Sequence, residues 1–439
     1  MSLWKSRSNC FYSIMEGNLV VSGFLVGESL SSIIDYSLRI LKELIAIPTV
    51  NPPGEHYEDA ASFLADELKS IGMSVRLIRI PEAWLDKHYP YAPLHRGYPR
   101  VIVYAWTEDV SRPTIHFNGH YDVVPPGTGW SFDPFKPIVR NGKVYGRGSN
   151  DMKAGIAATI AVLREALSRG LESRVRLEAA FVPDEESGGM GTKYLVEEFG
   201  VRPSNVVIAE PSGVSKVGVG HKGYVRGLIR VYGRQAHASL PMYGVNAFEK
   251  ACQLLSILMS AYAGRLREVR SKYPFEPEEA ASPTISFGGY AESTSKKDNI
   301  VPGEFVFSFD RRTIPEEDIE EVIRGLGRAV EQAASQAGVK ASIEVKAAIP
   351  GALTDPDSPL VKLAIDAAKH VGVEARPFVA AGRTDQVYYT KSGSTVITWG
   401  PGVQGTSHAV DEYVTIEEIQ AILKGYMYML EMADKYLPA

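Results

Sequence analysis

Short, almost continuously apolar segments alternate with amphipathic ones along the first half of the chain. TIHFNG, RLEAAFV and NVVIAE (residues 114–119, 176–182 and 205–210) are shorter than a typical helix, and their apolar character is that of strands buried on both faces. Between the first two, AGIAATIAVLREALSRG carries apolar residues at helical spacing. This alternation predicts an α/β fold with a mostly parallel sheet covered by helices.

The pattern changes near residue 222, where YVRGLIRVYGR alternates apolar and polar residues like an antiparallel strand exposed on one face. Three more strand-like and two helical segments follow before the α/β pattern returns. Because 439 residues are too many for one core of ordinary size, we predict more than one domain. The simplest division is an α/β domain of residues 33–221 and 349–439, interrupted by an α+β domain of residues 222–348 with a four-stranded sheet and two helices. Residues 1–32 form a predicted N-terminal extension.

Composition excludes several classes of protein. A formal net charge of -5 argues against a nucleic-acid binder that works through a basic surface. The 2 cysteines form neither a CxxC pattern nor a disulfide framework, which indicates a reducing, cytoplasmic compartment and argues against thiolate metal sites. The chain contains no run of 18 apolar residues, so no membrane span is predicted. The N-terminal residues lack a clean signal-peptide pattern.

Histidines and carboxylates follow the predicted buried strands. His120 and Asp122 stand two residues apart at the end of one strand, so both can lie on the same face. This spacing suits a metal ligand oriented by an acidic partner, although a solvated polar loop explains it equally well. Other strand ends and helix starts carry further candidates, each of which alone could be a helix cap, an acidic turn or a surface histidine. These candidates are Asp151, Glu185, Glu186, Glu210 and His408.

The joint occurrence of these residues favours a metal centre. In open α/β sheets, ligands gather at the carboxyl ends of the strands, so residues distant in sequence can converge there. Two neutral imidazoles and three carboxylates suit zinc, with cobalt or manganese as alternatives. Crowded carboxylates would repel one another, and a pair of divalent cations removes that repulsion. We therefore expect two divalent metal ions.

Five motifs carry a resemblance to a known family. NGHYDVVPPG, YGRGSNDMKAG, PDEESGG, AEPSG and SHAVDEYV, in this order, resemble those of the M20 metallopeptidases, and the resemblance spans roughly residues 33 to 435. This family includes acetylornithine deacetylases, succinyl-diaminopimelate desuccinylases, aminoacylases and glutamate carboxypeptidases. The wording of the first two motifs is most similar to the acetylornithine deacetylase and desuccinylase branch.

The resemblance implies a fold with a di-metal catalytic domain and a set of metal ligands. His120 and Glu210 would bind one ion, Glu186 and His408 the other, and Asp151 would bridge them.

Two further residues are implied to act beside the metal ions. Asp122 would orient His120, and Glu185 would be the general base that takes a proton from a water molecule shared by two ions about 4 Å apart. Adjacent residues of a strand point in opposite directions, so Glu185 and Glu186 would not easily bind the same ion. A turn between them would leave Glu185 free to take the proton of the water. The family also implies a cis peptide bond between Asp151 and Met152.

The inserted domain has candidates of its own, which the resemblance makes part of a lid and dimerisation domain. His237 resembles the family histidine that reaches across a homodimer and stabilises an oxyanion, although a strand-end polar residue is the plainer interpretation. Asn299 and Arg312 match motifs that contact substrate. Arg312 is preferred to Arg311 because it keeps an Asp-x-Arg spacing from Asp310, and its fork suits a carboxylate.

Arg383, in AAGRTDQVYY, stands where a small residue is expected in the family's Gly-rich segment beside the substrate. If its side chain points inward, it can bind an acidic acyl group such as succinyl. If it points outward, it has no role at the site.

The resemblance therefore predicts a di-zinc amidohydrolase that cleaves the amide bond of an N-acyl amino acid, of the acetylornithine deacetylase or succinyl-diaminopimelate desuccinylase type. A carboxypeptidase or dipeptidase of the same family is the alternative, with a dipeptide as substrate. A catalytically silent metal-binding homologue is a third interpretation, and the presence of Glu185 argues against it. Pocket shape chooses the acyl group and the amino acid, so motifs do not identify the substrate.

Overall fold

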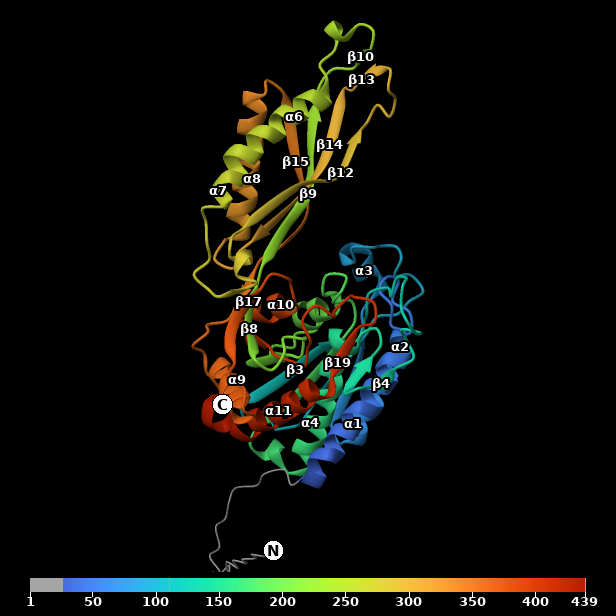
Figure 1. The fold of residues 1–439 in the computed structure, drawn as a ribbon, viewed down its shortest axis with the longest axis vertical. Coiled ribbons are helices and arrows are strands. Elements are labelled where there is room, and N and C mark those ends of the chain that lie inside the picture. Colours follow the sequence, from blue (N-terminus) through green and yellow to red (C-terminus); the bar gives the residue numbers. More distant parts are fainter. Residues whose placement is uncertain (1–26, 110, 439) are drawn as a thin grey trace, which may run out of the picture.

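The computed structural model describes residues 27–109 and 111–438 (Figure 1). Of the predicted N-terminal extension, residues 1–26 lie outside the described residues, and helix α1 begins at Gly27. A larger body built on a mixed sheet carries a smaller body at one end, and both segments that join them run through the same narrow region (Figure 1). None of the helices in the described part of the chain combines the length and the apolar character needed to cross a membrane.

The sheet of the larger body has its parallel strands at the centre. Its order is β1-β2-β6-β3-β7-β18-β8-β17-β11, with β16 paired to β8. Strands β6, β3, β7 and β18 are mutually parallel, as are β8, β17 and β11. The strands are β1 (Ser74–Arg79), β2 (Val101–Trp106), β3 (Thr114–His120), β6 (Arg176–Val182), β7 (Asn205–Ile208), β8 (Lys216–His221), β11 (Phe275–Glu276), β16 (Ala352–Leu353), β17 (Arg376–Ala380) and β18 (Thr395–Thr398). The predicted mostly parallel sheet is confirmed.

Helices cover both faces of this sheet. One face carries the larger core, to which α1 (Gly27–Ala46), α2 (Tyr57–Ser70), α4 (Ala154–Ser168), α9 (Pro359–His370) and α11 (Ile416–Tyr436) contribute. The other face is covered by α3 (Glu82–His88), α5 (Met190–Lys193) and α10 (Gln386–Lys391).

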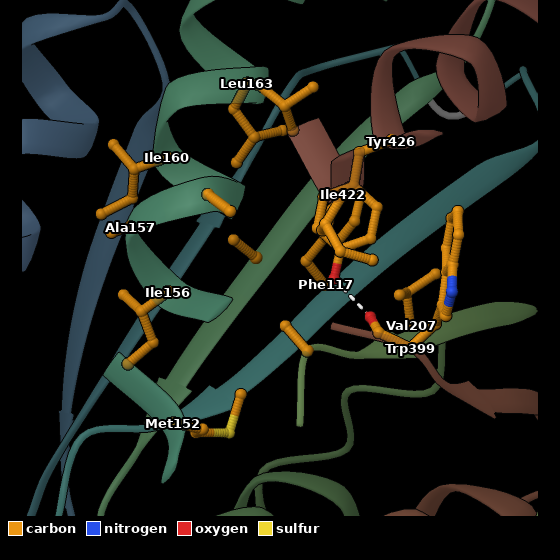
Figure 2. Close-up of a cluster of buried hydrophobic side chains, with 14 of the residues drawn as sticks. Phe117, Met152, Ile156, Ala157, Ile160, Leu163, Val207, Trp399, Ile422 and Tyr426 are labelled. Atoms are coloured by element: carbon orange, nitrogen blue, oxygen red, sulfur yellow. Dashed lines mark hydrogen bonds between the residues drawn. The ribbon is translucent and has the colours of Figure 1, made fainter. Parts of the chain in front are cut away.

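Helix α4 is apolar around most of its circumference because it lies between the sheet and two other helices. Ile156 and Ile160 of α4 belong to the same buried cluster as Phe117 of β3 (Figure 2). On α11, Tyr426 donates its hydroxyl hydrogen to the carbonyl oxygen of Trp399 (Figure 2). This packing fixes β3 and the start of α4 relative to each other, and both elements position the site described below.

The smaller body is the inserted four-stranded antiparallel sheet predicted from the sequence. Its order is β12-β14-β9-β15, and α6 and α8 pack on one face. Strand β9 alternates buried and more exposed residues, as its sequence indicated. The elements are β9 (Gly223–Tyr232), β12 (Thr284–Ser293), β14 (Glu304–Thr313), β15 (Lys340–Ile349), α6 (Ala247–Ile257), α7 (Ala263–Leu266) and α8 (Ile319–Gln336). The short pair β10 (Ala236–His237) and β13 (Ile300–Val301) forms the tip farthest from the larger body (Figure 1).

Two features do not follow from the sequence patterns described above. Residues 80–99 contain α3, in which Leu85 is buried against the sheet. A separate three-stranded sheet was not predicted, because its strands are short and one of them comes from near the C-terminus. It contains β4 (Ile138–Arg140), β5 (Lys143–Tyr145) and β19 (Tyr413–Thr415).

Candidate metal centre

The predicted histidines and carboxylates meet at one edge of the large sheet. His120 is the last residue of β3, Glu185 and Glu186 follow β6, and Glu210 follows β7. These strands are parallel, so their carboxyl ends meet at the same edge. Asp151 lies in the turn that opens α4, and its peptide bond to Met152 is cis, as the family resemblance implied.

Asp151 lies between two imidazoles. Its Oδ1 is 3.2 Å from His120 Nε2, and its Oδ2 is 3.5 Å from His408 Nε2. Each imidazole nitrogen has a second carboxylate beside it: Glu210 Oε1 lies 3.4 Å from His120 Nε2, and Glu186 Oε1 lies 2.8 Å from His408 Nε2. The donors therefore form two imidazole–carboxylate pairs that share one carboxylate.

Burial makes this concentration of negative charge costly. The pKa of Glu210 is raised to about 7 by burial and by the charge of Asp151. Burial also raises the pKa of Glu186, whereas the hydrogen bond that His408 donates to Glu186 raises the pKa of His408 to about 9. Protons thus take the place of a positive charge in the metal-free fold. Imidazole nitrogens and carboxylate oxygens at these spacings form a donor set that fits divalent cations such as zinc.

Asp122 orients the first imidazole through its backbone as well as its side chain. His120 Nδ1 lies 3.0 Å from the carbonyl oxygen of Asp122 and 3.5 Å from Asp122 Oδ1. A proton on Nδ1 leaves Nε2 free as an acceptor. The carboxylate of Asp122 also accepts hydrogen bonds from the backbone N–H groups of Glu185 and Glu186, each at 3.2 Å.

The turn after β6 sends the two adjacent glutamates to different partners. Asp184 has a φ of 64°, and Glu185 and Glu186 follow it directly. Glu186 contacts His408, whereas Glu185 Oε1 accepts a hydrogen bond of 3.0 Å from Arg383 Nη2. The turn expected between Glu185 and Glu186 is therefore present, and Arg383 points inward.

A carboxylate that the sequence analysis did not single out holds the turn around Asp151. Glu412 accepts hydrogen bonds from the backbone N–H groups of Asn150 at 2.9 Å and Asp151 at 3.0 Å, and Arg147 pairs with it at 2.6 Å. Glu412 lies within the SHAVDEYV motif, four residues after His408. That proximity was the only signal in the sequence.

A second unforeseen group supports the turn after β6. Asn51 donates to Asp122 Oδ2 at 2.8 Å and to Asp184 Oδ1 at 3.2 Å. The fully buried Arg100 donates to Asp184 Oδ2 at 3.0 Å. No local pattern marks these residues, because their partners lie far along the chain.

The predicted residues of the inserted domain do not join this cluster within the chain. His237 and Asn299 are exposed at the tip, where the N–H of Ala238 donates to the carbonyl oxygen of Asn299 at 3.0 Å (Figure 1). Arg312 is paired with Asp310 on β14, with Nε 2.7 Å from Oδ1. Arg311 is buried and pairs with Glu317, which gives it a structural role.

The pH dependence of stability without metal tests the burial of Glu210. Its pKa is about 7 in the fold against an ordinary value of 4.5, so the fold retains a proton that the unfolded chain releases between these values. Wild-type stability therefore decreases as the pH rises through this window. We expect the free energy of unfolding of Glu210→Gln, measured relative to wild type in chelator-treated protein, to rise by roughly 3 kcal/mol from pH 4 to pH 8. Urea unfolding measures this gain, and a difference that does not vary with pH would contradict it.

Known proteins similar to this chain agree with the family resemblance found in its motifs. A model described as peptidase family M20/M25/M40 matches residues 116–434. A succinyl-diaminopimelate desuccinylase of Nitratiruptor sp. is 28% identical over 397 residues, covering 88% of this chain and 96% of its own.

Two solved structures are similar in fold. The M20 family metallo-carboxypeptidase Sso-CP2 of Sulfolobus solfataricus has a TM-score of 0.70 and 19% identity, covering 91% of this chain and 99% of its own. A dinuclear metal binding peptidase of Bacillus subtilis has a TM-score of 0.68 and 14% identity, covering 93% of this chain and 100% of its own.

Proposed function

The chain belongs to peptidase family M20/M25/M40 and is a metallohydrolase of that family, and from this premise we propose that it cleaves the amide bond of an N-acyl amino acid at a centre of two divalent ions. The observation that carries this proposal is the position of Asp151, whose two carboxylate oxygens face two different imidazoles. A carboxylate between two imidazole–carboxylate pairs suits two ions better than one. Zinc is the ion we propose, with cobalt or manganese as substitutes.

The donors would divide between the two ions. His120 and Glu210 would hold one, His408 and Glu186 the other, and Asp151 both. Once bound, two such ions supply Lewis acidity, which polarises the scissile carbonyl and lowers the pKa of water.

Glu185 is the proposed general base. It would take a proton from the attacking water and deliver it to the leaving nitrogen, so that the amide becomes a carboxylate and a free amine. Burial raises the pKa of Glu185 above its ordinary value, which suits a group that must first accept and then release a proton. A catalytically silent homologue would not need such a group beside the ligands.

The proposed substrate class is an N-acyl amino acid such as N-acetylornithine or N-succinyl-diaminopimelate. The desuccinylase name of the relative above supports this class. Arg312, on the inserted sheet, is proposed to bind the α-carboxylate, and Asn299 stays a predicted substrate contact. A peptidase acting on short peptides with a free carboxylate is the second candidate, and the fold shared with a metallo-carboxypeptidase favours it.

A homodimer would complete the site. His237, in β10, is exposed at the tip of the inserted domain, the end farthest from the larger body that carries the cluster (Figure 1). We propose that it serves a second copy, where it would donate a hydrogen bond to the oxyanion that forms when water adds to the carbonyl. Exposed Leu240, Met242 and Tyr243 beside it give the tip an apolar surface suited to contact with that copy.

Mixing two inactive variants tests donation between subunits. We expect His237→Ala and Glu185→Gln each to be inactive alone, and their 1:1 mixture, refolded or exchanged, to recover about a quarter of wild-type activity. Half of the dimers would be mixed, and each would contain one site with an intact Glu185 and an intact His237. Failure to recover activity in a mixture shown to contain heterodimers would contradict donation across a dimer.

A substrate panel tests the reaction itself. Zinc-loaded protein would be assayed with N-acetylornithine, N-succinyl-diaminopimelate, other N-acyl amino acids and dipeptides. We expect the highest kcat/KM on an N-acyl amino acid. Preference for a dipeptide would select the peptidase, and the absence of turnover on every compound by protein with both ions bound would refute the hydrolase proposal.

A further inference from the structure

Arg383 forms an ion pair with Glu185, the glutamate that we propose as the general base. It lies in the loop between β17 and α10, and its Nη2 donates to both the carbonyl oxygen and Oε1 of Glu185, at 2.9 and 3.0 Å. The two side chains are only 10% and 11% exposed. A buried, charge-assisted hydrogen bond to one carboxylate oxygen restricts the rotation of that side chain strongly.

Arg383 is itself held in place. Its Nη1 donates to the carbonyl oxygen of Thr384 at 3.3 Å and lies 3.5 Å from Asp385 Oδ1. Asp385 is buried, and its Oδ2 accepts a hydrogen bond of 2.6 Å from the hydroxyl of Thr192. The guanidinium is thus fixed between two buried carboxylates from different segments of the chain.

Glu185 needs such restraint because it lies close enough to the metal donors to become one. A carboxylate oxygen of Glu185, Nε2 or Nδ1 of His120 and a carboxylate oxygen of Glu210 all lie within 4.8 Å of one another. A glutamate that turned toward His120 and Glu210 would coordinate the cation, and its lone pair would no longer accept a proton from water. The reaction requires Glu185 to remain outside the metal's coordination sphere.

We infer that Arg383 is a positioning residue that keeps Glu185 available as a base and prevents it from becoming a metal ligand. This inference rests on the proposed role of Glu185. It differs from the role expected from the sequence, in which Arg383 binds an acidic acyl group, because both Nη atoms of the guanidinium already contact oxygen atoms of the protein.

The test compares Arg383→Ala with the matched control Arg376→Ala. Arg376 lies at the start of β17, the strand that leads into this loop, and its side chain is 72% exposed. Each variant would be assayed on the N-succinyl and the N-butanoyl derivative of one amino acid, which differ in the terminal carboxylate of the acyl group. For Arg383→Ala we expect kcat to fall about 10- to 100-fold on both derivatives with KM nearly unchanged, and added guanidinium ion to restore part of it. Arg376→Ala should resemble wild type.

Cobalt-substituted protein gives a readout independent of turnover. We expect the visible spectrum of Arg383→Ala to change as Glu185 enters the coordination sphere, and Glu185→Gln in the same background to reverse the change. An unchanged spectrum together with wild-type kcat would overturn the inference. A rise in KM confined to the succinyl derivative would also overturn it, in favour of substrate recognition.

Two controls keep the outcomes separate. If Glu185→Gln alone retains wild-type turnover, the proposed function fails, whereas loss of turnover in Glu185→Gln with full turnover in Arg383→Ala refutes only the positioning role. If Arg383→Ala does not fold, Arg383→Lys carries the same test. Lysine keeps the positive charge, but its single nitrogen cannot replace both Nη1 and Nη2 of the guanidinium. For Arg383→Lys we expect an equal fall of kcat on both derivatives, and a loss confined to the succinyl derivative would contradict the inference.

Discussion

Replacing Glu185 by glutamine is expected to lower kcat by about 10²- to 10⁴-fold, the usual contribution of a general acid–base residue, while both metal ions remain bound. Glutamine keeps the size of the side chain and can still contact Arg383 through its amide oxygen. It cannot accept the proton of the attacking water. KM should change little, because in the proposed mechanism Glu185 acts on the water and the leaving nitrogen and does not anchor the substrate.

Metal analysis and steady-state kinetics on the same preparation measure this effect. Glu197→Gln, a change at a glutamate in the helical segment that follows the same turn, is the matched control and should retain wild-type kcat. Turnover of Glu185→Gln near the wild-type rate would remove Glu185 from the mechanism. Loss of metal from the variant would instead make Glu185 a ligand.

Asp151→Asn is expected to have the second large effect, on metal binding itself. Both oxygens of Asp151 face donor pairs, so we expect its loss to weaken the binding of both proposed ions. Glu186→Gln would remove a proposed ligand from one pair only. When the free concentration of a metal ion is about a hundred times its Kd at each of two sites, binding stabilises the fold by about 5 kcal/mol. We expect that gain to be lost in Asp151→Asn and about half of it to remain in Glu186→Gln.

Thermal or urea unfolding with and without zinc measures the gain, and inductively coupled plasma mass spectrometry counts the ions per chain. The backbone N–H of Asp151 is bound to Glu412, so asparagine leaves the turn intact and the metal-free stability near that of wild type. If Asp151→Asn kept the full zinc-induced stabilisation, Asp151 would not bridge two ions.

The architecture and the convergence of the polar residues could be predicted because both depend on short-range regularities. Continuous apolar runs indicated strands buried on both faces, and parallel strands bring their carboxyl ends to one edge. The i, i+2 spacing of His120 and Asp122 placed them side by side, and the structure gives a contact of 3.0 Å between His120 Nδ1 and the carbonyl oxygen of Asp122. The inserted sheet was recognisable from the change to strict alternation at residue 222.

The supporting residues could not be predicted, because their partners are distant and their geometry depends on turns. Glu412 contacts Asp151 across 261 positions, and Arg383 contacts Glu185 across 198. Arg383 was recognised as unusual in its segment, but the sequence could not tell whether it would meet a substrate or a neighbouring glutamate. Asn51 and Arg100 carry no motif, and only the fold shows that they fix the turn of Asp184.

The inserted domain marks a different boundary of sequence reasoning. Motif resemblance selected His237 and Asn299, yet both lie at the tip, away from the cluster of their own chain (Figure 1). Their predicted roles therefore depend on a second copy, and the complementation experiment above tests this dependence for His237.

Anomalous diffraction from crystals of the zinc-loaded, active protein tests the two-ion centre most directly. We expect two peaks about 3.5–4 Å apart, one beside His120 and Glu210 and the other beside His408 and Glu186, with the carboxylate of Asp151 between them. A single peak, or peaks away from Asp151, in protein that turns over its substrate would contradict it.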